Sequence, residues 1–542
     1  MTISLTTVIV LSLGVVTIAT PEVCDKYCSP GQSCWPSFEE EVDLYTAMNG
    51  HLVTAYTADY AEYVLMPNTR VMKLPFVLVF PKTVDEVITA VNFANKYNIR
   101  MTIRSSGHDY IGRSTADGSL QINLMNMTDI KFNMSSSRSP DGEVTVESGN
   151  SWLRVYNETS KMGRVIVGGS AHTVSMGGYT LGGGHSPIGR KFGLAIDNLL
   201  EVKLVIANGS VVIANENGTT VFDADTGHPY HTSNNDLFWA LRGGGGSTYG
   251  IVVSFTFRLH KDSKMVVLSC STPVYDANQN DIGRPFLESL GNVLPNLAPE
   301  WGGYLMFSNT QMQNSTSGTM NIFLNHFGEW GSPSFNTIQP FLSNCNAKNV
   351  SSFLEYESTV YDPLYYRQYI FNTLVQPDGL TPQFYDFMYS LIGDPRLTTD
   401  IGCTGAMIGG NMKNTPAPNT SMNPNMRTGL LSLSCGIAWS SALEDRKWEL
   451  LGQEFSTKLL KYGKGVYYNE PSAYLPDWKT QYWGGNYHRL LAIKDTWDPY
   501  NVFTCYHCVG SDEARLPRPT GATSNQTGNG HFEFHPPVIA VG

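Results

Sequence analysis

The stretch "FVLVFPKTVDEVITAVNFANKYNIRMTIRSSGHDY", residues 76–110, constrains the fold more than any other part of the chain. Its first five residues form a short apolar run that predicts a buried strand. Thr83 and Glu86 have the spacing of a capping box, and the apolar residues that follow recur at helical spacing until Asn98. Residues 100–104 return to a strand pattern. The order is β-α-β, which predicts a sheet that is at least partly parallel.

The loop "SSGHD" follows the second of these strands directly and carries His108. Loops at the carboxyl ends of strands are where open α/β sheets gather ligands. From the residues alone, His108 is a metal ligand or a loop histidine with satisfied hydrogen bonds. Zinc is the weaker reading, because His108, His172 and His185 lack the spacing and the carboxylate or thiolate partners of a zinc site.

Two further glycine-rich stretches resemble this loop in kind: "GGYTLGGGHS" and "RGGGGSTYG". Glycine lets a backbone approach a ligand closely and turn its N–H groups toward an anion. Together the three loops predict a cradle for a pyrophosphate-bearing cofactor. None has the GxGxxG spacing of the dinucleotide fingerprint. The alternative is a set of ordinary loop glycines in a chain that contains 51 of them.

The rest of the chain divides by pattern. Residues 199–215 predict an antiparallel hairpin that turns at Asn208-Gly209. Residues 265–465 alternate aromatic strand-like runs with amphipathic segments, which predicts a second, substrate-facing domain. The tail after Asp512 is rich in Pro, Gly and Thr and is expected to be disordered. A formal net charge of -11 without a basic block argues against a nucleic-acid binder.

The N-terminus predicts secretion. Residues 1–20 are apolar but short for a membrane span, and Ala19 is a candidate cleavage point. Because this start lacks Lys and Arg, an uncleaved anchor is the alternative; no later segment predicts stable membrane insertion. The sequons expected on a glycosylated surface are Asn126, Asn133, Asn157, Asn208, Asn217, Asn314, Asn349, Asn419 and Asn525.

The nine cysteines also fit an oxidising compartment. Cys24, Cys28 and Cys34 cluster near the N-terminus, where a disulfide would staple the chain. Because the chain has nine cysteines, an odd number, at least one of them lies outside an intrachain pair. The "CYHC" sequence at Cys505 and Cys508 is predicted to form a structural disulfide, and a redox pair is the alternative.

Four motifs in order carry a resemblance to a known family: "RSSGHD", "GGYTLGGGHSPIGRKFGLAIDNLLEVKLV", "LFWALRGGGGSTYGIV" and "YWGGNYHRLLAIKDTWDPYNVF". They resemble the berberine-bridge-enzyme-like branch of the vanillyl-alcohol-oxidase flavoproteins, over residues 60–265 and 465–510. The resemblance implies an α+β fold, with a PCMH-type FAD-binding domain of β-α-β units and mixed sheet. The second domain would be an antiparallel sheet covered by helices.

The expected divisions combine that resemblance with the patterns at the two ends of the chain. They are a signal peptide at 1–19, an N-terminal Cys-containing segment at 20–70, the FAD domain at 71–262, the substrate domain at 263–465, a segment returning to the FAD domain at 466–511 and a tail at 512–542.

The resemblance also implies how FAD is held. The family's histidine at the position of His108 is bonded covalently to the flavin. Many members add a cysteinyl bond, but Ala171 stands at that position here, so a single bond is expected. Val174 stands at the family's gatekeeper position beside the flavin, where valine goes with access for dioxygen. That favours an oxidase over a dehydrogenase.

Other positions match the family's cofactor contacts. The pyrophosphate would lie on Arg104, Ser105, Ser106, Gly107 and Asp109. The flavin and its ribityl chain would lie on Gly178, Gly182, Gly183, Gly184 and His185. Ile251 or Val252 would lie near the adenosine, and Asn486 and Tyr487 would close the domain. Tyr179 stands where plant relatives often have histidine, which leaves that contact open.

The base that would remove the substrate's hydroxyl proton is expected in "GVYYNEPSAY". Plant members commonly have tyrosine after the asparagine, whereas this chain has Glu470. Tyr468 and Glu470 are therefore joint candidates, with Tyr467 behind them. The alternative is that these residues only pack between domains.

The sequence thus predicts a secreted FAD oxidase of an alcohol or carbohydrate, with a sugar's anomeric hydroxyl favoured and dioxygen as acceptor. A specialised metabolite such as an alkaloid, phenolic or aromatic alcohol is the second reading. A flavin-fold binding protein without turnover is the third. Oligomeric state cannot be predicted from these residues.

Overall fold

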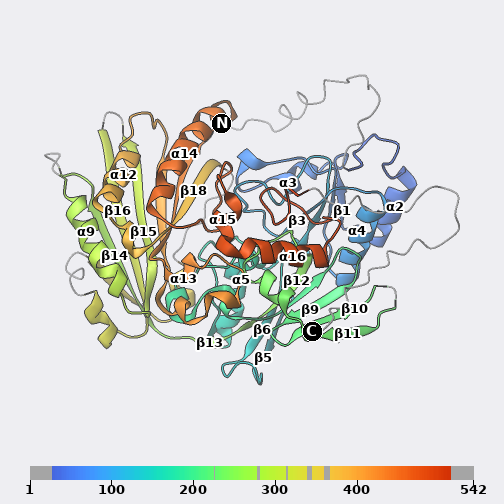
Figure 1. Ribbon diagram of the computed structural model, residues 1–542, viewed down its shortest axis with the longest axis horizontal. Helices are drawn as coiled ribbons and strands as arrows, with labels where there is room; N and C mark the ends of the chain where they lie inside the picture. Colours follow the sequence, from blue (N-terminus) through green and yellow to red (C-terminus); the bar gives the residue numbers. More distant parts are fainter. Residues whose placement is uncertain are drawn as a thin grey trace.

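The computed structural model describes residues 27–224, 226–276, 281–312, 315–338, 345–358 and 366–513, and the side chains of 309–317 lie outside that description. The expected signal segment, Cys24, the tail after Glu513 and the sequons Asn314 and Asn525 therefore lie outside the described residues. Figure 1 shows two lobes, with the N-terminal helices on one side and the long strands of residues 265–439 on the other.

The predicted β-α-β unit forms a four-stranded sheet in the order β1-β2-β4-β3. Strands β2 and β3 both run parallel to β4, which confirms the parallel component. The elements are β1 (Leu52–Thr54), β2 (Val77–Val79), α4 (Val84–Lys96), β3 (Met101–Arg104) and β4 (Leu120–Asn123). One face of α4 is buried through alanines and valines at helical spacing.

The capping of α4 is only half of the predicted box. The Thr83 hydroxyl accepts the N–H of Glu86 at 3.2 Å, as expected. The Glu86 carboxylate instead accepts the N–H of Lys82 at 2.6 Å and the side-chain amide of Asn49 at 2.8 Å. The reciprocal bond to Thr83 was therefore a wrong prediction, because Asn49 and Lys82 draw the carboxylate past the cap.

A seven-stranded antiparallel sheet completes the first lobe, in the order β11-β10-β9-β8-β12-β6-β5. The predicted hairpin is confirmed, because β8 and β9 pair antiparallel across Asn208-Gly209. The strands are β5 (Ile130–Asn133), β6 (Glu143–Glu147), β8 (Leu199–Val205), β9 (Val211–Asn215), β10 (Gly218–Phe222), β11 (Pro229–Thr232) and β12 (Ile251–Arg258). A small pair, β7 (Arg164–Val165) with β13 (His260–Lys261), lies beside it.

Short helices connect these strands. They are α2 (Phe38–Ala47), α3 (Tyr60–Val64), α5 (Trp152–Lys161), α6 (Met176–Leu181), α7 (Gly189–Phe192) and α8 (Asp236–Leu241). Helix α6 carries Gly177 and Gly178, the first two glycines of the second glycine-rich loop, and α8 leads into the third. No helix in the part of the chain that the structure describes is long and apolar enough to cross a membrane.

The second lobe is an antiparallel sheet of seven strands in the order β17-β14-β16-β15-β19-β20-β18. Helices α9 (Gly283–Val293), α12 (Pro382–Ile392) and α14 (Asp445–Leu459) pack on it through a shared hydrophobic core (Figure 1). The strands are β14 (Met265–Pro273), β15 (Trp301–Met312), β16 (Ser315–Phe327), β17 (Cys345–Val350), β18 (Arg367–Val375), β19 (Ile401–Met407) and β20 (Leu431–Trp439). This is the expected α+β fold class.

The chain then returns to the first lobe through α15 (Trp478–Trp483) and α16 (Tyr487–Trp497). Trp483 donates its indole N–H to the Gly243 carbonyl at 3.0 Å. Tyr249 donates its hydroxyl to the Leu490 carbonyl at 3.2 Å. The C-terminal motif of the sequence therefore closes over the third glycine-rich loop.

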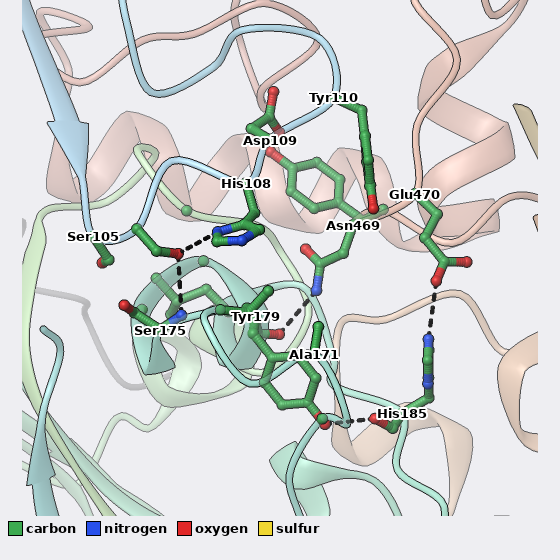
Figure 2. A pocket seen from close by; sticks show the side chains of 18 of the residues that line it. Ser105, His108, Asp109, Tyr110, Ala171, Ser175, Tyr179, His185, Asn469 and Glu470 are labelled. Carbon is green, nitrogen blue, oxygen red and sulfur yellow. Dashed lines mark hydrogen bonds and ion pairs between the residues drawn. The ribbon is translucent and has the colours of Figure 1, made fainter. Parts of the chain in front are cut away.

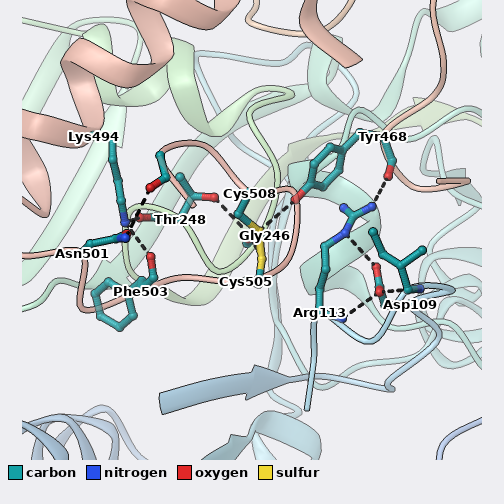
Figure 3. Close-up of a disulfide and its surroundings, with 12 residues drawn as sticks. Asp109, Arg113, Gly246, Thr248, Tyr468, Lys494, Asn501, Phe503, Cys505 and Cys508 are labelled. Atoms are coloured by element: carbon teal, nitrogen blue, oxygen red, sulfur yellow. Dashed lines mark hydrogen bonds and ion pairs between the residues drawn. A yellow bond between two sulfur atoms is a disulfide. The ribbon is translucent and has the colours of Figure 1, made fainter. Parts of the chain in front are cut away.

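Among the described residues, eight cysteines form disulfides: Cys28–Cys34, Cys270–Cys345, Cys403–Cys435 and Cys505–Cys508. The first and last agree with the predicted staple and the predicted "CYHC" pair. Figure 3 shows that the last of them lies against the third glycine-rich loop, where the Cys508 sulfur is 3.7 Å from the Gly246 carbonyl oxygen.

Candidate active site

A cavity of about 660 Å³ opens between the two lobes, and all three glycine-rich loops reach it. The first loop contributes residues 105–109, the second 177–185 in part, and the third Gly246, Ser247 and Gly250. This volume is typical of small-molecule and cofactor sites. Segments far apart in sequence thus meet at one place, as Figure 2 shows for ten labelled side chains.

His108 projects from the first loop into this cavity, and hydroxyls hold both of its ring nitrogens. Nδ1 lies 2.9 Å from the Ser106 hydroxyl, and Nε2 lies 2.9 Å from the Thr173 hydroxyl. Ser106 is itself anchored, because its oxygen accepts the N–H of Ser175 at 3.1 Å. The ring therefore has a fixed orientation toward the cavity.

Ala171 and Val174 line the same cavity, in the segment that also carries Thr173. Tyr179 lies behind them and donates its hydroxyl to the His185 carbonyl at 2.5 Å (Figure 2). Burial raises the pKa of the Tyr179 phenol well above its ordinary value. Tyr179 therefore lines the site as a neutral phenol.

The backbone of the loops fits an anionic ligand approaching closely. A Cβ added to Gly178 would meet no atom within 4 Å, because this position opens toward the cavity. Gly107 has a φ of +83°, a conformation that glycine adopts without strain. Among the described residues, the N–H groups of Ser106 and Gly107 donate to no protein acceptor. The donor set therefore fits the pyrophosphate of FAD.

Glu470 and His185 face each other on the side of the cavity nearer the second lobe. Glu470 Oε1 lies 3.0 Å from His185 Nε2. Its other oxygen accepts the Asn372 amide at 2.9 Å and the Ser434 hydroxyl at 2.5 Å. The carboxylate is therefore held by strands β18 and β20 and aimed at the histidine (Figure 2).

The two candidate tyrosines also line the cavity, but their hydroxyls are committed elsewhere. The Tyr467 oxygen accepts the Gly184 N–H and the Asn469 side-chain N–H, each at 2.9 Å. Burial, with a contribution from Glu470, raises the pKa of Tyr467. The Tyr468 hydroxyl lies 3.3 Å from the Cys508 sulfur, and burial raises the pKa of this phenol too.

Most of the predicted cofactor residues reach the cavity, and some do not. Those that line it are Ser105, Ser106, Gly107, His108, Asp109, Ala171, Val174, Gly178, Tyr179, His185 and Val252. Those that do not are Arg104, Gly182, Gly183, Gly184, Ile251, Asn486 and Tyr487.

The second group supports the cavity from behind. The Arg104 guanidinium donates to the carbonyls of Tyr63 and Leu65, both at 2.8 Å, and so braces the first loop. The Asn486 amide donates to the carbonyls of Ser421 and Met422, both at 3.1 Å. The matched motifs thus contain bracing residues as well as lining residues.

The sequence did not single out Arg113, which is nearly fully buried beside the first loop. Its guanidinium lies 3.3 Å from the Asp109 carboxylate, 3.8 Å from the centre of the Tyr468 ring and 2.9 Å from the Tyr468 carbonyl (Figure 3). No spacing pattern links residues 113 and 468, so no sequence signal could have found this contact.

Two family models match the chain: "FAD binding domain" over residues 75–215 and "Berberine and berberine like" over 466–509. An uncharacterized FAD-linked oxidoreductase of Arthroderma benhamiae is 29% identical over 463 residues, covering 81% of this chain and 78% of the relative. Among solved structures, the VAO-type flavoprotein MtVAO615 of Myceliophthora thermophila C1 has a TM-score of 0.73 at 24% identity, covering 90% of this chain and 97% of that one.

A xylooligosaccharide oxidase of Myceliophthora thermophila C1, solved with xylobiose, shares the fold at a TM-score of 0.69 and 19% identity, covering 86% of this chain and 98% of that one. Fold, cavity and matches together define an FAD-linked oxidoreductase. Both ends of the first lobe thus match models of FAD-binding and berberine-like proteins, and the chain is similar to VAO-type flavoproteins in sequence and fold.

Proposed function

We propose that this protein is a secreted oxidase that carries FAD covalently on His108 and passes hydride from an alcohol carbon to the flavin and then to dioxygen, giving hydrogen peroxide. One observation carries the proposal. A single cavity holds a fixed imidazole on the first glycine-rich loop and a fixed carboxylate, Glu470, from the returning segment. The FAD domain would comprise residues 71–262 with 466–511, and the substrate domain 263–465.

When bound, FAD supplies the hydride acceptor. The glycine-rich loops hold it by backbone N–H groups, with Asp109 fixed by Arg113 at their edge. Ala171 offers no thiol, which supports a single histidyl bond. Val174 lines the cavity with a small side chain, which supports access for dioxygen.

Glu470 is the residue that we assign as the base. Its carboxylate lies on the cavity wall, whereas raised pKa values disfavour the phenolate of Tyr467 and of Tyr468. A positioned base of this kind contributes roughly 10²- to 10⁴-fold to the rate. Hydrogen bonds from Asn372 and Ser434 orient the carboxylate, and His185 on its other oxygen can share the proton that it removes.

The substrate class has two supported readings. A sugar's anomeric hydroxyl, favoured by the sequence, is supported by the likeness to an oligosaccharide oxidase. An aromatic or other apolar alcohol is supported by the cavity wall that β14, β15 and β16 provide. This wall includes Val267, Met306 and Phe323, and the last two are 38% and 36% exposed. Aliphatic and aromatic side chains of this kind suit an apolar ring better than a row of hydroxyls.

Secretion is supported by the four disulfides, since such bonds persist in oxidising compartments. Glycosylation is supported at the sequons whose asparagines are exposed: Asn133, Asn157, Asn217, Asn349 and Asn419. Intact mass of the protein from culture medium, before and after enzymatic removal of N-glycans, tests both.

The function is tested by adding cellobiose, xylobiose and 4-hydroxybenzyl alcohol to the purified protein without oxygen and following the flavin absorbance. Bleaching by a sugar or by the aromatic alcohol, with hydrogen peroxide formed after air is admitted, supports the corresponding class. If no alcohol bleaches the flavin while an oligosaccharide still binds, the protein is a flavin-fold binding protein and the oxidase proposal fails.

A further inference from the structure

The segment from Ser170 to Thr173 connects the first lobe's histidine to a buried carboxylate of the second lobe. Glu357 ends α11 (Phe353–Glu357) and is 0% exposed. Its Oε1 accepts the Ser170 hydroxyl at 2.9 Å, and its Oε2 lies 3.7 Å from His172 Nε2. Thr173, the next residue, contacts His108. Both neighbours of Ala171 are therefore held by one carboxylate.

The contacts of His108 are compatible with a tautomer in which Nε2 carries the proton. The Ser106 oxygen accepts the N–H of Ser175 and keeps its own O–H, which can donate to Nδ1 at 2.9 Å. With Nδ1 as the acceptor, a neutral imidazole carries its proton on Nε2. That N–H then donates to the Thr173 hydroxyl at 2.9 Å. The lone pair that can form a new bond is the one on Nδ1.

We propose that Thr173 and Glu357 are positioning residues for the covalent attachment of the flavin. Thr173 orients the His108 ring in the tautomer whose Nδ1 carries no proton, and Glu357 holds the segment that presents Thr173. The inference rests on the proposed attachment at His108 and goes beyond it, by assigning the residues that make this imidazole ready to react.

The step balances as follows. One N–C bond forms between His108 Nδ1 and the flavin's 8α-methyl carbon, and one C–H bond of that methyl breaks. The methyl hydrogen, the Nε2 proton and two electrons end on the ring system, and dioxygen takes both hydrogens and both electrons as hydrogen peroxide. While the new bond forms, positive charge grows on the imidazole. The Thr173 oxygen accepts the Nε2–H hydrogen bond and stabilises that charge until the Nε2 proton leaves.

The burial of Glu357 explains why it can hold the segment firmly. A buried carboxyl is costly unless it is hydrogen-bonded, so it keeps the partners that it has. The Tyr304 hydroxyl adds to this network by donating to Ser170 at 2.9 Å. Movement of residues 170–173 away from Glu357 would leave its carboxyl without the Ser170 bond, and the segment therefore stays in place beside His108.

The test uses the full-length protein freed of flavin during production and then incubated with FAD in air. The attached fraction is the yellow colour that stays with acid-precipitated protein, measured over time, and reversible FAD binding is measured separately at the start. Thr173→Val keeps the shape of the side chain but removes the hydroxyl. We expect attachment to slow about tenfold or more, the effect of one lost hydrogen bond to a group that becomes charged, with unchanged reversible binding.

Thr173→Ser should restore the parent rate, since it restores the hydroxyl, and Thr457→Val on the exposed face of α14 should leave the rate unchanged. Glu357→Gln should also slow attachment, and its melting temperature shows whether the fold is kept. The inference is overturned if Thr173→Val attaches FAD at the parent rate, or if Thr173→Ser is as slow as Thr173→Val. A parent protein that binds FAD but never retains it in acid would instead refute the proposed covalent link, and this inference with it.

Discussion

The Glu470 carboxylate meets the His185 imidazole at 3.0 Å across the cavity, although 285 residues separate them in the chain. The pairing depends on the whole fold. His185 follows the glycines of the second loop, whereas Glu470 lies on the segment that returns from the second lobe, where Asn372 of β18 and Ser434 of β20 hold it. This pair on the cavity wall is therefore assembled only when both lobes are in place.

Replacing this carboxylate by an amide tests its role as base. We expect Glu470→Gln to slow flavin bleaching by the active alcohol about 10²- to 10⁴-fold, because the amide keeps the size of the side chain but cannot accept a proton. Stopped-flow absorbance without oxygen measures the rate. Glu329→Gln, at an exposed surface position, is the matched control and should react as the parent does. A Glu470→Gln rate within threefold of the parent would move the base to another residue.

Loss of the imidazole tests the attachment site. His108→Ala should lose all colour on acid precipitation, since no other residue is expected to form a bond to the flavin. Ser105, Gly107 and Gly178 still line the cavity, so reversible FAD binding should persist. His231→Ala removes an exposed histidine on β11 and should stay yellow in acid. Colour that survives in His108→Ala would show that another side chain carries the flavin.

Local patterns predicted the elements that depend on neighbours in sequence. The apolar spacing of residues 84–96 gave the helix, the Asn208-Gly209 turn gave the hairpin, and the three glycine-rich loops indicated one ligand. Contacts between distant residues had no such pattern. Arg113 reaches the Tyr468 carbonyl across 355 residues, and Ser170 reaches Glu357 across 187.

The motifs were also less selective than they looked. They include bracing positions as well as lining positions: the side chains of Arg104 and Asn486, which the resemblance placed at the cofactor, donate to backbone carbonyls. Only three-dimensional packing separates a residue that lines a cavity from one that supports its wall.

A single added methylene at Val174 tests access for dioxygen. Val174→Leu should slow oxygen consumption about tenfold or more, equivalent to about 1.4 kcal/mol in the barrier, while anaerobic bleaching by the same alcohol keeps its rate. An oxygen electrode and stopped-flow absorbance separate the two half-reactions. Val267→Leu adds the same group at another position on the cavity wall and serves as the control. Equal oxygen consumption by Val174→Leu and the parent would refute the gatekeeper assignment.

A partly buried neutral histidine predicts how stability depends on acid. His260 stacks on Phe192 with ring centres 4.2 Å apart and donates Nε2–H to the Asn198 side-chain oxygen at 2.7 Å. The Asn198 amide is oriented for this, because its NH₂ group donates to the Phe192 and Leu194 carbonyls. Burial, with nearby Arg258, lowers the pKa of His260 from 6.5 to about 4.

The folded state therefore binds this proton more weakly than the unfolded chain does. The stability that His260 contributes is fully present above pH 6.5 and is lost as the pH falls through about 4. The loss is at most about 3 kcal/mol, at 1.36 kcal/mol for each pKa unit.

Urea unfolding followed by tryptophan fluorescence at pH 7, 5 and 4 measures this loss of stability. His260→Gln should lose less stability than the parent between pH 7 and 4, because it has no proton to bind. His228→Gln, at an exposed position, should follow the parent. Stability that falls equally with pH in the parent and in His260→Gln would mean that this imidazole does not couple folding to acid. Other buried groups, including His507 with its pKa lowered to about 4, would then account for any acid sensitivity.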